Sequence, residues 1–178
     1  MHSDGRAGRG LEDKYMKDTG VKDSLRTGIT FGLTSAVITT LGLMIGLHSG
    51  SGSKMIVLGG IITIAIADAF SDALGIHVSE ESENVHTTWE IWCATIATFL
   101  AKFCFALTFV VPVLLLPLDT AIVVSAAWGL SILAVLSYVI AKMQGERPWK
   151  IIGEHLLIAV VVIAVTNWVG HWVATFAG

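Results

Sequence analysis

The stretch that decides the fold is residues 55–77, MIVLGGIITIAIADAFSDALGIH. It is long and apolar enough to cross a bilayer, which takes about 20 residues of helix. Asp68 and Asp72 lie inside it, one helical turn apart on the same face. Acids are costly in hydrocarbon and usually face a bundle interior or a wet cavity on an ion path. Two carboxylates on one face are hard oxygen ligands for a divalent cation, so the pattern predicts a membrane helix that carries an ion site.

The remaining composition extends this interpretation to the whole chain of 178 residues. Hydrophobic residues make up 54% and charged residues 14% of the sequence, whereas about a quarter of a soluble domain is charged. Pro112 predicts a kink near the end of the third apolar stretch. We therefore expect an all-α integral membrane protein, with a tail at residues 1–24 and one transmembrane domain at residues 25–178. Its five predicted helices are 26–47, 55–77, 89–116, 120–141 and 151–176.

Basic residues predict the orientation of these helices. Positive charges flanking membrane helices favour the cytoplasmic side. Apart from Lys54 and Lys102, the bases lie before or at the start of the first span or between the fourth and fifth spans: Arg6, Arg9, Lys14, Lys17, Lys22, Arg26, Lys142, Arg147 and Lys150. The rule then puts the N-terminus in the cytoplasm and the C-terminus outside or in a lumen. The N-terminal tail could be a solvated, frayed segment or a short interfacial helix.

The loop after the second predicted helix is rich in acids. Glu80, Glu81 and Glu83 follow Asp72 within a few helical turns, and histidines lie close by in the sequence. We expect these acids to gather cations at the cytosolic mouth of a path that leads to Asp68. Carboxylates combined with imidazoles suit Fe²⁺, Mn²⁺ or Zn²⁺. The alternative for this segment is a solvated acidic loop with no ligand.

Lys102 is the only basic residue deep inside a predicted span. Its ammonium needs an anionic partner there, and Asp68 and Asp72 are the candidates. A lysine ammonium paired with these aspartates would occupy the position of a metal ion. A metal ion could then bind only by displacing the ammonium. Lysine can exchange protons where its surroundings disfavour the charge, so a coupled proton antiport is one hypothesis. The other is an internal ion pair that fixes helix packing.

Two motifs carry a resemblance to a known family. They are Gly28–Thr34, GITFGLT, and Ser71–Glu83, SDALGIHVSEESE. With the spacing of the helices, they resemble the vacuolar iron transporter family of five-helix cation/proton exchangers. The resemblance implies a homodimer, N-terminus inside, that moves Fe²⁺ and often Mn²⁺ out of the cytosol. The ion path would follow the dimer interface and be lined by the first two helices.

The chain departs from the family pattern at several positions. Phe31 stands where an aspartate is common, and Asp72 takes the position of a methionine ligand. Asp68 and Lys102 are additions, whereas Glu83 matches a family acid directly. The cytoplasmic metal-binding domain that many members insert after the second helix is missing. The resemblance therefore supports the predicted fold more strongly than it supports the predicted substrate.

These observations leave more than one function open. The leading hypothesis is a proton-coupled exporter of Fe²⁺ or Mn²⁺, with the metal as substrate and no cofactor. Its partners would be the lipid bilayer, the divalent cation and a second copy of the chain, with no nucleic acid. The alternatives are a non-transporting scaffold or accessory subunit with an internal Asp–Lys pair, and a carrier of another cation such as an organic amine. No nucleophile–base set or cofactor motif predicts an enzyme. A prokaryotic plasma membrane and an organelle membrane such as a vacuole both fit.

Overall fold

Every element in the described part of the chain is a helix. The computed structural model describes the backbone of residues 4–177 and the side chains of residues 19–176. Its helices are α1 (Asp4–Ser51), α2 (Lys54–Glu83), α3 (Thr88–Thr108), α4 (Val110–Leu115), α5 (Leu118–Gln144) and α6 (Pro148–Ala177). The interfacial helix expected within residues 1–24 falls mostly on side chains outside the described part, and it stays a prediction.

Five segments of these helices are long and apolar enough to cross a membrane, by length and composition. They are Thr19–Ser51, Lys54–Glu83, Thr88–Leu115, Leu118–Gln144 and Pro148–Phe176. Large apolar side chains also cover the outside, for example Phe70 at 62% exposure and Trp168 at 66%. Contiguous exposed apolar surface of this kind needs a lipid or protein environment. The prediction of an all-helical fold with five helices long and apolar enough to span a membrane is thus confirmed, while its orientation relative to the cytosol stays a prediction.

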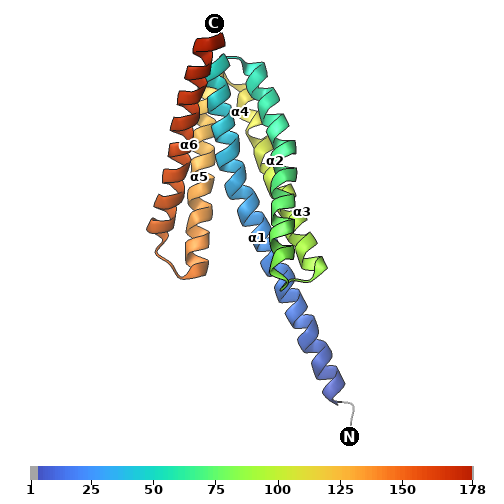
Figure 1. Ribbon diagram of the computed structural model, residues 1–178. Helices are drawn as coiled ribbons and strands as arrows, with labels where there is room; N and C mark the ends of the chain where they lie inside the picture. Colours follow the sequence, from blue (N-terminus) through green and yellow to red (C-terminus); the bar gives the residue numbers. More distant parts are fainter. Residues whose placement is uncertain (1–3, 178) are drawn as a thin grey trace.

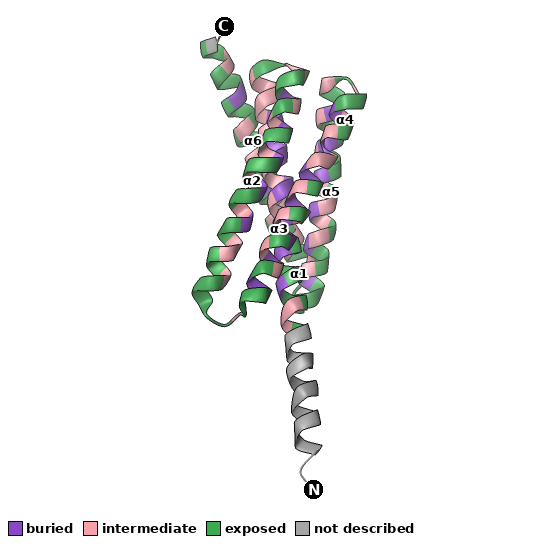
Figure 2. Cartoon of the chain, turned by 90° about the vertical axis from the view of Figure 1, so that its right-hand side faces the viewer, coloured by how far each residue is buried: buried purple, intermediate pink, exposed green. Residues whose placement is uncertain are grey.

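Helix α1 is the central element of the bundle. It packs against α2, α3, α5 and α6, and Figure 1 shows it running between the α2–α3 pair and the α5–α6 pair. Its buried side chains include Val37, Leu41 and Met44, each at most 1% exposed. Figure 2 shows buried residues along the inner faces of the helices and exposed residues over the outside. The core is therefore organised around one helix rather than around a symmetric four-helix centre.

Glycine allows α1 and α3 to pack very closely. A Cβ atom added at Gly32 would lie 2.7 Å from the carbonyl oxygen of Thr98, and one added at Gly28 would meet the carbonyl oxygen of Ala94 even more closely. Small residues at four-residue spacing let membrane helices approach backbone to backbone. This contact brings the middle of α3 against α1.

The third span is broken, as Pro112 predicts. The helix is interrupted at Phe109, between α3 and α4. A proline lacks the backbone N–H and clashes with the carbonyl group four residues earlier, which here belongs to Thr108. At the far end of α4, Lys54 Nζ donates to the carbonyl oxygens of Leu114 and Leu116, 3.1 Å away in each case. The side chain of Lys54 thus satisfies two carbonyl groups at the end of this helix.

We predict that Gly32→Ala lowers the free energy of unfolding by about 1–3 kcal/mol, because the new methyl group collides with backbone and not with a flexible side chain. The measurement is thermal or SDS-induced unfolding of the purified protein in detergent. Gly75→Ala is the matched control, since a Cβ at Gly75 meets nothing within 4 Å, and its stability should be unchanged or slightly raised. Equal loss in both variants would contradict the packing argument.

Candidate ion site

Lys102 lies at the centre of the polar site. Its side chain is 1% exposed, and its Nζ lies 2.6 Å from Asp68 Oδ2. The same ammonium donates to Asp72 Oδ2 and, over 2.8 Å, to Ser35 Oγ. A lysine ammonium has three protons to donate and cannot accept. Two of its protons are donated to Ser35 and Asp72, whereas Asp68 Oδ2 is buried, forms an ion pair with the ammonium and accepts no hydrogen bond from the described residues. We call Asp68, Asp72 and Lys102 the ion triad.

The pattern of α2 explains where the two carboxylates lie. Its buried residues repeat every fourth position: Val57, Ile61, Ala65, Ala69 and Ala73. Asp68 and Asp72 each precede one of these alanines, so they lie on the rim of the buried stripe. Their side chains keep 24% and 18% exposure, whereas Lys102 belongs to the buried face of α3. The Lys102 ammonium is buried inside the bundle, whereas the two aspartate side chains stay partly exposed.

The contact between Lys102 and the aspartates confirms the predicted pairing, and it shows that both acids take part. Two carboxylates and one ammonium carry a net charge of −1 when all three are ionised. Breaking such a pair by removing one partner leaves an uncompensated buried charge, which costs far more than removing all partners together. The triad is therefore a unit, and whether a metal ion binds there stays a prediction.

Two of the three predicted mouth acids form a second, separate group with His86. Glu80 Oε2 lies 3.1 Å from His86 Nε2, and Glu83 Oε2 lies 3.8 Å from the same nitrogen. The Glu81 side chain is exposed. Glu80 follows Asp72 by eight residues, about 12 Å along a helix. Four of the five predicted ligands thus lie in two groups, Glu81 joins neither group, and the structure does not bring the five into one site.

No group of three or more His, Cys, Asp or Glu side chains lies within metal-binding reach in residues 19–176. A cation at the triad would therefore depend on two carboxylates together with oxygen atoms of other kinds. Ser35 supplies one such oxygen. Ser35 was not predicted from the sequence, because a lone serine on a small-residue helix gives no signal of its own. Only its contact with Lys102 identifies it.

Glu90 has a structural role that the sequence also signals. It is 8% exposed, and its Oε2 accepts hydrogen bonds from the backbone N–H and the hydroxyl of Thr87, over 2.7 and 2.9 Å. The pair forms a capping box at the start of α3, for which Thr-x-x-Glu is the sequence pattern. Gly20 of α1 leaves room for this carboxylate, because a Cβ there would overlap it.

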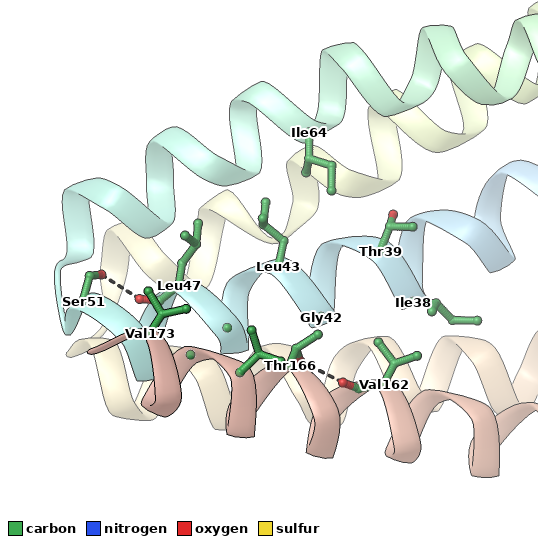
Figure 3. Close-up of a pocket in the computed structure, with 14 residues that line it drawn as sticks. Ile38, Thr39, Gly42, Leu43, Leu47, Ser51, Ile64, Val162, Thr166 and Val173 are labelled. Carbon is green, nitrogen blue, oxygen red and sulfur yellow. Dashed lines mark hydrogen bonds between the residues drawn. The ribbon is translucent and has the colours of Figure 1, made fainter. Parts of the chain in front are cut away.

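An apolar groove opens on α1 between α2 and α6 (Figure 3). It encloses about 700 Å³, and three glycines of α1 line it: Gly42, Gly46 and Gly50. One end approaches the triad. Thr39, which lines the groove, donates to the carbonyl oxygen of Ser35 over 2.9 Å. The groove therefore runs from Ser51 at the end of α1 to within one helical turn of the residue that contacts Lys102.

No protein-family model matches the chain, and no curated protein matches it. The resemblance to the vacuolar iron transporter family rests on the quoted motifs alone. Fold and site together define a class: a helical protein with five membrane-spanning segments, in which a buried lysine is held by two carboxylates of a neighbouring span.

We predict that Lys102→Met lowers the free energy of unfolding by about 3–5 kcal/mol, because Asp68 and Asp72 lose their counter-ion. Adding Asp68→Asn and Asp72→Asn should restore most of the lost free energy of unfolding, since a neutral site no longer needs a cation. Unfolding in detergent measures both variants. Lys142→Met removes an exposed base and is the control. If the triple variant is destabilised as much as Lys102→Met alone, then packing, and not charge, makes Lys102 necessary.

Proposed function

We propose that the protein exports divalent transition-metal cations from the cytosol in exchange for protons, with the ion triad as the exchange site. The observation that carries the proposal is the contact of Lys102 with both Asp68 and Asp72 inside the membrane-spanning region. Ionisable residues at such depth mark ion and proton pathways. The partial exposure of the two carboxylates gives a cation a side from which to approach.

Charge balance connects cation binding to proton release. A divalent cation between two carboxylates gives a neutral site only if Lys102 has lost its proton. If Lys102 stayed charged, the site would hold an extra positive charge next to the metal, and like charges at that distance in a poorly solvated site repel strongly. Cation entry therefore requires at least one proton to leave. The reverse step, protonation of Lys102, expels the cation.

The donor atoms favour one member of the expected substrate pair. Asp68, Asp72 and Ser35 offer only oxygen to a cation that replaces the ammonium. Oxygen ligands suit Mn²⁺, whereas Fe²⁺ is also well served by imidazole. We therefore expect Mn²⁺ to be the better substrate at the triad. The group of Glu80, Glu83 and His86 would first collect the ion at the cytosolic end.

A homodimer fits the open groove on α1. The groove is apolar and lined by glycine, which suits the close approach of another helix. A second copy packed against it would cover the approach to the triad. This arrangement agrees with the dimer-interface path that the family resemblance implies.

The second candidate is a non-transporting scaffold of the same fold. The burial of Lys102 at 1% exposure, in ion pairs with both aspartates, favours it, because an internally neutralised lysine needs no further cation. Thermal stability separates the two. A cation that binds the native protein must raise its apparent stability, so a shift with Mn²⁺ supports the transporter, and none with any divalent metal supports the scaffold.

We predict that purified protein in liposomes takes up Mn²⁺ when the lumen is acidic, and that the double variant Asp68→Asn, Asp72→Asn abolishes this uptake. Quenching of a lumenal dye by Mn²⁺ measures the flux, and dissipating the pH gradient with an ionophore should remove uphill transport. Glu146→Gln, at an exposed acid outside the triad and the mouth group, should transport like the unmodified protein. Equal flux in the double variant would refute the site.

A further inference from the structure

A second polar pocket lies at the end of the bundle where α5 turns into α6. It encloses about 420 Å³ between the first turns of the α1 span and the α5–α6 hairpin. Figure 1 shows this turn beside the lower part of α1. Neither Ser35 nor any residue of the ion triad lines it. The pocket is therefore separate from the ion triad.

One part of this pocket is rich in hydrogen-bond donors. Arg26, Thr27, Thr30 and Gln144 supply these donors, and His155 lines the pocket beside them. The side chains of Thr27, Thr30 and Gln144 have no protein hydrogen-bond partner among the described residues. A preformed set of unpaired donors beside a guanidinium suits an anionic group with several acceptor oxygens, such as phosphate.

Arg26 is available to such a ligand. Its only ion pair among the described residues is with Asp23, at 3.8 Å, and the two side chains are 59% and 62% exposed. An exposed pair at that separation is screened by water and contributes little. A guanidinium has five N–H donors in a planar fork. It can therefore bind a phosphate with two parallel hydrogen bonds while Asp23 stays nearby.

His155 forms a fixed wall of the pocket. Its Nδ1 lies 2.8 Å from Ser137 Oγ, and this hydroxyl donates to the carbonyl oxygen of Leu133 over 2.6 Å. Ser137 is fully buried, so the ring is anchored to the interior of α5. The anchored imidazole holds α6 at a set distance from α5, and the pocket is open without any rearrangement.

The other part of the pocket is apolar. This apolar surface distinguishes a phospholipid from free phosphate as the ligand. Phe31, Ile140 and Met143 line the same pocket, and Phe31 and Met143 are 42% and 48% exposed. Free phosphate gains nothing from such surface. A phospholipid places a phosphate at the membrane boundary and acyl chains directly beside it. Basic pockets between membrane helices on the cytoplasmic side bind lipid headgroups in this way.

We propose that this pocket binds the phosphate headgroup of a membrane phospholipid, with Arg26 as its charged ligand and Phe31 and Met143 against the acyl chains. The surrounding charge supports an anionic lipid. The segment from the end of α5 into α6 carries three bases, Lys142, Arg147 and Lys150, against the acids Glu146 and Glu154. A lipid bound here joins α1 to the α5–α6 hairpin and depends neither on cation transport nor on the triad.

The test is native mass spectrometry of the full chain in detergent, titrated with phosphatidylglycerol. The unmodified protein should retain one tightly bound lipid. Arg26→Gln should weaken it about tenfold or more, because charge-assisted hydrogen bonds are lost. Arg147→Gln removes a base of the same turn that does not line the pocket, so it should weaken binding much less than Arg26→Gln does. A galactolipid with the same acyl chains but no phosphate should not be retained.

A free-phosphate control and a second variant complete the test. Thermal protection by inorganic phosphate alone, without protection by phosphatidylglycerol, would overturn the lipid assignment in favour of a free anion. The double variant Thr30→Val, Gln144→Leu keeps the charge of Arg26 and should also weaken lipid binding, so it carries the test if Arg26→Gln fails to fold. Unchanged lipid binding in the double variant, or in a folded Arg26→Gln protein, would refute the site.

Discussion

The ammonium group of Lys102 must be neutralised where it lies, and the rest of the membrane domain is arranged to do so. A buried charge without a partner costs several kcal/mol, so α3 cannot hold Lys102 in its inner face unless acids reach it. Asp68 and Asp72 meet this need from α2, and Ser35 completes the coordination from α1. Three helices must therefore meet at one level of the bundle. This requirement fixes their relative rotation as well as their contact.

Small residues make that meeting possible. Gly28 and Gly32 bring α1 against α3, and alanines fill the buried stripe of α2 beside the triad. In a bilayer the hydrophobic effect does not drive helices together, so close backbone packing and polar contacts have to do it. The glycines and the triad thus support one another. Close packing brings the charges within contact distance, and the charges hold the closely packed helices in register.

The charges also separate the molecule into functional regions. The triad lies within the spans, the group of Glu80, Glu83 and His86 lies at the α2–α3 turn, and the donor-rich pocket lies at the α5–α6 turn. The first two regions share α2 and provide successive positions along one proposed cation path. The third lies on another face of α1. A cation carrier and a lipid-anchored scaffold would use these regions differently, although the fold is the same for both.

The sequence by itself determined the number of spans, because apolar length and charge content leave no other structure for the backbone in a bilayer. It also identified Asp68, Asp72 and Lys102, since ionisable residues inside a span stand out against apolar neighbours. Only the tertiary structure decided that both aspartates contact the lysine, that Ser35 joins them, and that Glu80 and Glu83 pair with His86. Those outcomes depend on the rotation and distance of helices far apart in the chain. Hydrophobic periodicity gives the inward face of each helix but not which residues of its neighbour lie opposite.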